Sequence, residues 1–139
     1  MLVMLFFSFI SLTSFAPSTN IISIPKFESI KAPVSNSYEP LIEAIFRWET
    51  RGMPDSLAYK AHNKAEGAFG GLQIRQCRIE HYNQLTGKNY TLTDMYDFNK
   101  SKEVFLYFAQ GKTYEHAAKD WNGSGPLTIK YWEAVKALL

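Results

Sequence analysis

Three glycines within five residues restrict what the stretch AEGAFGGLQI, residues 65–74, can become. Gly67, Gly70 and Gly71 weaken any helix or strand that includes them, because glycine loses more conformational freedom on ordering than any other residue. Glycine also adopts positive φ and lets another chain or a ligand approach the backbone closely. We therefore predict a bend, a bulge or the wall of a binding site, with the amide of Gln73 at its exit.

The composition is that of a globular domain with a substantial core. The chain has 139 residues, of which 46% are hydrophobic and 20% are charged, which excludes a disordered chain. Aromatic residues make up 15%, enough to line a groove as well as fill a core. The net charge of +2 gives little support for nucleic-acid binding. Cys77 is the one cysteine, so the fold has no internal disulfide to stabilise it.

The N-terminal residues 1–16 resemble an export signal. Residues 1–10 are apolar, and Ser14 and Ala16 are spaced like a cleavage site for a signal peptidase. The apolar run is too short and too rich in serine for a membrane span, so export is favoured over the alternative, an uncleaved N-terminal anchor. We expect a protein of the periplasm or cell envelope, or a secreted one.

The rest of the chain divides into a linker and one domain. Residues 17–37 contain three prolines and many Ser and Asn residues, as expected for a linker. In residues 38–139, apolar residues recur at a helical period in five segments. These predicted helices run from a cap at Ser37 to about Gly52, from Gln76 to Leu85, after Asn99, after Thr113, and from Thr128 to the end with Trp132, Val135 and Leu138 inward.

Apart from a short hairpin near residues 66–74, no segment alternates long enough to form a strand. The predicted class is therefore mainly α, with little or no β-sheet.

Glu49 is an acidic residue on an apolar helix face. It follows Ile45 by four residues and Phe46 by three, which places the three side chains together on a helix. It also lies in the last turn, where the helix dipole disfavours negative charge. Burial and dipole both favour the protonated form, which a general acid needs near neutral pH. The alternative is that Glu49 ends the helix in solvent or pairs with Arg47 or Arg51.

A second candidate segment is AAKDWNGSGP, residues 117–126. Trp121 offers a flat apolar face that suits a protein core or the face of a sugar ring. Asn122 can cap the preceding helix or present its amide to a ligand. Taken separately, both residues have ordinary structural explanations.

Together, the segments resemble the soluble lytic transglycosylase and goose-type lysozyme family. That family has a catalytic glutamate before Ser or Thr, then a G-A-x-G-L-x-Q-like stretch, then an aromatic-Asn-x-Gly motif. Here Glu49-Thr50, GAFGGLQI from residue 67 and WNG from residue 121 occur in that order, over residues 39–139. The resemblance implies that residues 38–139 form a small lysozyme-like helical domain with a substrate cleft.

The resemblance also implies a reaction and its residues. The substrate would be a peptidoglycan glycan strand, cut at the MurNAc-GlcNAc β-1,4 bond by a monomeric protein, with Glu49 as the acid. The substrate-binding residues would be Gly67, Gly70, Gly71, Gln73, Trp121 and Asn122.

One acid favours the transglycosylase reaction, in which Glu49 acts first as acid and then as base. The alternatives are a hydrolase of the same bond and a catalytically silent peptidoglycan-binding module. A second carboxylate would favour hydrolysis, but each candidate has an ordinary turn or cap position in the sequence. The candidates are Asp55, Asp94, Asp97 and Asp120.

Other catalytic classes lack support in the sequence. His62, His81 and His116 do not have the spacing of a metal site, and Cys77 has no partner motif. No G-x-S-x-G elbow or G-x-x-x-x-G-K-[ST] phosphate loop is present. We therefore expect no metal and no cofactor, and contact with a membrane only through an uncleaved N-terminal segment.

Overall fold

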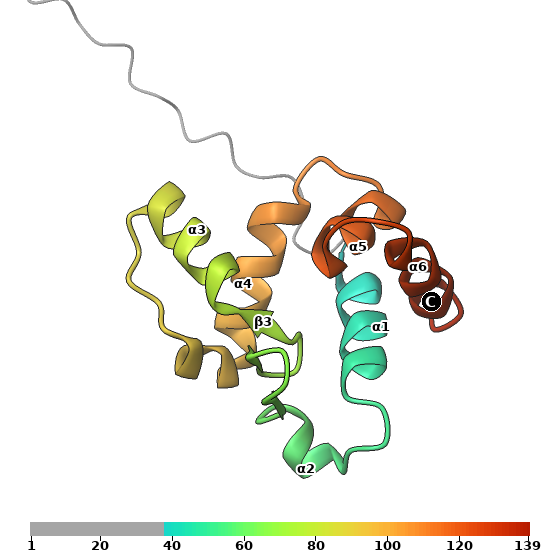
Figure 1. Ribbon diagram of the computed structural model, residues 1–139, viewed down its shortest axis with the longest axis horizontal. Coiled ribbons are helices and arrows are strands. Elements are labelled where there is room, and N and C mark those ends of the chain that lie inside the picture. The colour runs from blue at the N-terminus through green and yellow to red at the C-terminus, as the bar shows by residue number, and fades with distance from the viewer. Residues whose placement is uncertain (1–37) are drawn as a thin grey trace, which may run out of the picture. The chain divides into compact units, whose positions relative to one another are not determined.

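The computed structural model describes residues 38–139. The predicted export signal, residues 1–16, and the predicted linker, residues 17–37, lie outside the described residues. Within residues 38–139, helices dominate and the strands are short, so the mainly α class is confirmed. The elements in chain order are α1 (Glu39–Glu49), α2 (Asp55–Ala58), β1 (His62–Asn63), β2 (Ala68–Phe69), β3 (Ile74–Arg75), α3 (Gln76–Thr86), η2 (Leu92–Tyr96), α4 (Phe98–Ala109), α5 (Tyr114–Asn122) and α6 (Leu127–Lys136) (Figure 1).

The three strands form a small antiparallel sheet in the order β1-β2-β3. His62 lies opposite Phe69, and Ala68 lies opposite Arg75. The hairpin expected near residues 66–74 is therefore present as β2 and β3. With two residues in each strand, the sheet adds few hydrogen bonds. Its main effect is to fix the path of the chain between α2 and α3.

Helix α1 is the central element of one half of the domain. Leu41, Ile42, Ala44 and Ile45 are buried on one face, as the helical period predicts. This face packs against α5 and α6, which also pack against each other (Figure 1). The packing holds the C-terminal end of α1, where Glu49 is the last helical residue, beside the C-terminal end of α5.

The helix ends follow local capping chemistry. Asp97 accepts hydrogen bonds from the backbone N–H groups of Asn99 and Lys100 and so begins α4. Thr113 accepts from the N–H of His116 and begins α5. Gly87, with φ of 72°, ends α3 in the left-handed conformation that glycine favours. The predicted positions of α3 and α5 are confirmed, whereas α4 begins at Phe98, one residue before the Asn99 that was expected to precede it.

Three details of the helix prediction are wrong. The N-cap of α1 is Tyr38 rather than Ser37, which lies outside the described residues. The side chain of Tyr38 does not cap α1. Instead, its hydroxyl contacts residues distant in the sequence, at 2.6 Å from the carbonyl oxygens of both Ala109 and Lys112. Leu138 is 39% exposed rather than inward, because α6 ends at Lys136. The short helices α2 and η2 were not expected, because a single turn carries no periodicity.

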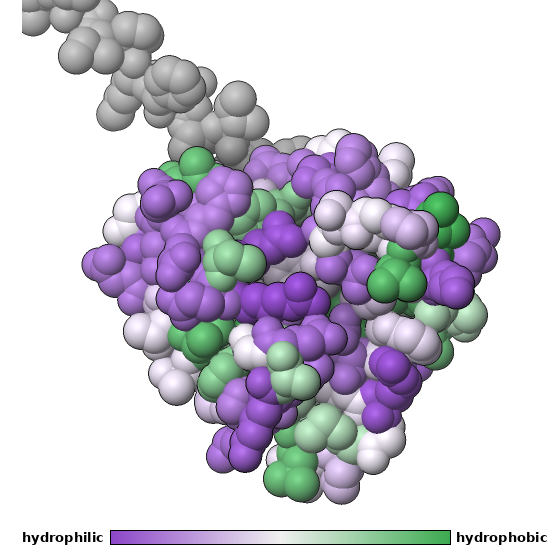
Figure 2. Space-filling view, viewed as in Figure 1, coloured by the Kyte–Doolittle hydropathy of each residue, from purple (hydrophilic) through white to green (hydrophobic). Residues whose placement is uncertain are grey.

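The core takes residues from all the longer helices. Phe105 of α4 is fully buried and packs edge-to-face on Trp121 of α5, with ring centroids 4.9 Å apart. The surface seen in Figure 2 is mainly hydrophilic, with apolar atoms near α2, where Met53, Leu57 and Tyr59 are exposed. No helix among residues 38–139 is both long and apolar enough to cross a membrane.

Candidate active site

Two adjoining pockets form a groove between elements that are far apart in the sequence. The first pocket, of about 600 Å³, lies between the C-terminal ends of α1 and α5, the β-strands and the start of α3. The second, of about 640 Å³, continues along the start of α6. Both sizes are typical of ligand sites. The residues that line both pockets, and so join them, are Trp48, Glu66, Arg75, Asn122 and Gly123.

Glu49 lies where the two pockets meet. Its side chain lines the first pocket and accepts a hydrogen bond of 2.8 Å at Oε1 from the hydroxyl of Tyr131, which lines the second. Thr50, the next residue, is buried and donates its hydroxyl to the carbonyl of Phe46 at 2.7 Å. The same carbonyl accepts from the backbone N–H of Thr50 at 3.0 Å, so two bonds from one residue fix the last turn. Tyr131 therefore orients the carboxyl group of Glu49, and the Thr50 bond fixes the backbone turn that carries it.

The surroundings of Glu49 favour its protonated form. Burial is the largest effect and raises the pKa of Glu49, and the nearby charge of Glu66 raises it further. The hydrogen bond from Tyr131 and the charges of Arg51 and Arg75 lower this pKa, but they only partly offset burial. The position at the C-terminal end of α1 adds to the upward shift, because the helix dipole is negative there. A carboxyl group with a raised pKa is suited to donate a proton near neutral pH.

Tyr131 is buried and remains a donor. Burial and the adjacent Glu49 raise the pKa of Tyr131 well above its ordinary value, so the phenol keeps its proton at neutral pH. This hydrogen bond stabilises the carboxylate form of Glu49 and orients one of its oxygens.

We expect Tyr131→Phe to raise the pKa of Glu49 further. The hydrogen bond favours the charged form, so its loss favours the proton, and Glu49 should titrate at higher pH. NMR titration of side-chain carboxyl carbons, with Glu49→Gln to assign the signal, measures this shift. Tyr107→Phe is the control, because Tyr107 is exposed on α4 and lies outside the groove. An unchanged or lower pKa in Tyr131→Phe would contradict this account of the site.

Gln73 lines the first pocket with a constrained backbone. Its φ is 51°, an uncommon value for a residue with a side chain. Its backbone N–H and its side-chain Nε2 donate to the same acceptor, the carbonyl of Gly70, at 3.0 and 2.9 Å. The turn from Gly70 to Gln73 thereby places the amide of Gln73 in the groove. The side-chain oxygen of Gln73 accepts no hydrogen bond from residues 38–139, which leaves it available to a ligand.

Trp121 and Asn122 enter the groove from the end of α5. The Nε1 of Trp121 donates to the carbonyl of Leu72 at 3.1 Å, which joins α5 to the glycine-rich stretch. Asn122 lines both pockets, and its side-chain amide makes no hydrogen bond within the described part of the chain. Of the six substrate-binding residues expected from the sequence, Gln73, Trp121 and Asn122 thus line the same pocket as Glu49.

The three glycines that were expected to wall the groove lie outside its lining. None lines either pocket. Gly70 is buried with φ of 74°, and a Cβ there would lie 2.0 Å from the carbonyl oxygen of Met95. A Cβ on Gly71 would lie 2.5 Å from the ring of Phe46. The absence of a side chain therefore lets Gly70 pack closely against η2 and Gly71 against α1. Gly67 has φ of 60° and open space around it, so it serves the turn itself.

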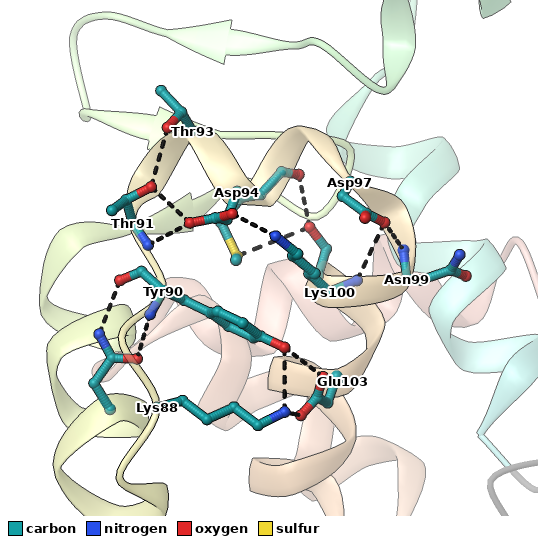
Figure 3. Close-up of polar contacts among 12 residues, drawn as sticks. Lys88, Tyr90, Thr91, Thr93, Asp94, Asp97, Asn99, Lys100 and Glu103 are labelled. Carbon is teal, nitrogen blue, oxygen red and sulfur yellow. Dashed lines mark hydrogen bonds and ion pairs between the residues drawn. The ribbon is translucent and has the colours of Figure 1, made fainter.

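The aspartates considered as second carboxylates lie outside the groove, and three of them have structural partners there. Figure 3 shows Asp94 accepting from Thr91 and pairing with Lys100, and Asp97 capping α4. The carboxylate of Asp120 lies 2.8 Å from Nζ of Lys112, and Asp55 lies in the first turn of α2. None of the four lines either pocket.

Glu66 is the other carboxylate in the groove. It lies on the loop between β1 and β2, and its Oε2 pairs with Nη2 of Arg75 at 2.7 Å. Glu66, Arg75 and Tyr131 were not among the expected site residues. The sequence separates Tyr131 from Glu49 by 82 positions, and no local motif marks it. The alternation of the hairpin, with Ile74 buried and Arg75 exposed, was the one signal that could have placed Arg75 in the groove.

No group of three or more His, Cys, Asp or Glu residues within residues 38–139 is arranged to hold a metal ion. The groove offers an acid at Glu49, a second carboxylate at Glu66, three side-chain amides and several cationic side chains. Comparison with known proteins found no matching family model, no matching curated protein and no matching solved structure.

Proposed function

We propose that residues 38–139 form a lysozyme-like domain that cleaves the MurNAc-GlcNAc β-1,4 bond of peptidoglycan as a lytic transglycosylase. The observation that carries the proposal is the convergence of three distant motifs on one groove. Glu49, Gln73 and the Trp121-Asn122 pair lie far apart in the sequence, yet all four line the first pocket. That arrangement is expected if the motifs have the roles that they have in the family the sequence resembles.

The geometry supports a reaction with one carboxyl group. Protonated Glu49 gives its proton to the glycosidic oxygen, and the bond from that oxygen to C1 of MurNAc breaks. The carboxylate of Glu49, which Tyr131 stabilises, then accepts the proton of the 6-hydroxyl group of the same sugar. Oxygen O6 bonds to C1 as the proton leaves, so the product is a 1,6-anhydro sugar and no water is consumed.

The other groove residues suit a glycan ligand. The amides of Gln73 and Asn122 offer donors and acceptors for hydroxyl and N-acetyl groups, and Trp48 and Trp121 offer aromatic surface. The proposal requires the protein to reach the cell wall, and the export signal expected in residues 1–16 would take it there.

Release of soluble muropeptides from purified peptidoglycan tests the proposal. The full-length protein should release them, and chromatography of the supernatant quantifies them. A folded protein that binds peptidoglycan but releases nothing would instead be a binding module.

A hydrolase is the second candidate, and the presence of Glu66 in the groove favours it. A second carboxylate could activate water for attack at C1. Glu66 is exposed and paired with Arg75, so under the transglycosylase proposal Glu66→Gln should retain activity within about tenfold of wild type.

Glu43→Gln is a matched control for Glu66→Gln. Glu43 is also exposed and paired with an arginine, Arg47 at 2.8 Å, but it lies outside the groove. A loss in Glu66→Gln of about 10²-fold or more, with Glu43→Gln unaffected, would contradict the single-acid reaction and favour hydrolysis.

A further inference from the structure

Arg78 is a cation in the lining of the first pocket, and its partners are uncharged. It lies on α3 and its side chain is half-buried. Its Nη2 donates to the carbonyl of Asp120 at 2.8 Å and to that of Trp121 at 3.5 Å, near the C-terminal end of α5. Its guanidinium carbon lies 4.8 Å from the ring centroid of Phe108 and 5.1 Å from that of Trp121. Two rings and two carbonyls thus hold the guanidinium in one place.

No carboxylate among residues 38–139 forms an ion pair with Arg78. The nearby carboxylate of Asp120 pairs with Lys112 and lies 3.4 Å from Nε2 of His116. Burial lowers the pKa of Arg78, and the nearby charge of Asp120 only partly offsets this effect. A desolvated charge costs free energy unless it is paired and hydrogen-bonded, and Arg78 has hydrogen bonds but no carboxylate partner.

The first pocket has more positive than negative side chains. Arg51, Arg75 and Arg78 line it, and the carboxyl groups that do so are Glu49 and Glu66. Glu49 has a raised pKa, and Glu66 is already paired with Arg75. The donors of Arg78 other than Nη2 make no hydrogen bond within the described residues. The pocket therefore lacks an anion that a fixed guanidinium could bind.

We propose that Arg78 binds a carboxylate group of the substrate in the first pocket. The proposal rests on the proposed function, and it adds a preference for carboxylate-bearing glycans over neutral ones. Guanidinium binds carboxylate with two parallel hydrogen bonds, and a side chain already fixed by its neighbours loses little entropy on binding. Peptidoglycan offers two sources of the carboxylate, the lactyl group of MurNAc where the peptide is absent and the peptide stem where it is present.

Binding to three ligands tests the proposal, measured on full-length protein carrying Glu49→Gln so that the ligand stays intact. The neutral ligand is a GlcNAc oligomer. The second is a peptide-free MurNAc-GlcNAc strand with free lactyl carboxylates, and the third is a strand whose lactyl groups all carry peptide stems. Adding Arg78→Gln should weaken binding of the second or the third ligand by about 10- to 100-fold, because a hydrogen bond between charged groups is worth about 1.5–3 kcal/mol. Binding of the neutral oligomer should change less than twofold, and the ligand that loses affinity identifies the source.

The ratio of affinities for carboxylated and neutral ligands is the decisive quantity, because a general structural defect weakens both. This ratio should be highest with Arg78, lower in Arg78→Lys and lowest in Arg78→Gln. If Arg78→Gln does not fold, the comparison with Arg78→Lys still tests the proposal. Arg47→Gln, on the exposed side of α1 outside the groove, should leave the ratio unchanged. A ratio independent of residue 78 would overturn the proposal while leaving glycan cleavage intact. Failure of all three ligands to bind would overturn both this proposal and the proposed function.

Discussion

Glu49→Gln should reduce glycan cleavage by about 10²–10⁴-fold while the protein stays folded. The amide has nearly the same shape as the carboxyl group, and its oxygen can still accept the hydrogen bond from Tyr131. It has no acidic proton to give to the glycosidic oxygen, and it cannot accept one later. Muropeptide release measures the loss, and circular dichroism checks the fold.

The same substitution has a stability signature that an unimportant surface glutamate would not show. The pKa of Glu49 is raised in the folded state, so folded protein retains this proton to higher pH than unfolded protein does. The free energy of unfolding therefore falls as pH rises from the unfolded pKa through the folded one. Glu49→Gln removes this loss, so its melting temperature relative to wild type should increase from pH 4 to pH 7. Near-normal cleavage by the variant would exclude Glu49 as the acid.

Gly70→Ala should destabilise the domain severely. Gly70 has φ of 74°, and an added Cβ would lie 2.0 Å from the carbonyl oxygen of Met95 and 2.8 Å from its carbonyl carbon. These are backbone atoms, so the clash requires η2 to move. Backbone strain and overpacking each cost about 1–3 kcal/mol, which together give roughly 2–6 kcal/mol. Urea unfolding followed by circular dichroism measures the change.

Gly67→Ala is the matched control for this substitution. Gly67 belongs to the same stretch and has φ of 60°, but nothing lies within 4 Å of a Cβ built there. Gly67→Ala should lower the free energy of unfolding only by the strain of a positive φ, which costs about 1–3 kcal/mol or less. Equal losses in the two variants would show that the contact with Met95 does not determine the role of Gly70.

The helices were predictable because their signals are local. The period of α1 placed Ile42 and Ile45 in the core, and the same period placed Glu49 against that face. Gly87 and Thr113 mark helix ends through chemistry that involves only their neighbours in the chain. The short elements α2 and η2 have too few residues to show a period, so their positions depend on tertiary packing.

The site was predictable only in part. Glu49, Gln73 and Asn122 were identified by motif, and the structure brings them together. The glycines were correctly expected to allow a close approach, but sequence does not show what approaches, and at Gly70 it is the backbone of η2.

Residues that reach the groove from other elements carry no local signal. Tyr131 meets Glu49 only because α6 packs against α1. Arg78 is recognisable as unusual only when its partners are known, because its lack of a carboxylate partner is a property of the folded chain.

Analysis of the products formed in water enriched with heavy oxygen tests the single-acid reaction most directly. Purified peptidoglycan is incubated with the full-length protein, and the released muropeptides are examined by mass spectrometry. The proposed reaction predicts 1,6-anhydro ends without heavy oxygen, because the attacking oxygen belongs to the sugar. It also predicts that Glu49→Gln lowers their release by about 10²–10⁴-fold. Reducing ends that carry heavy oxygen would contradict it and establish a hydrolase.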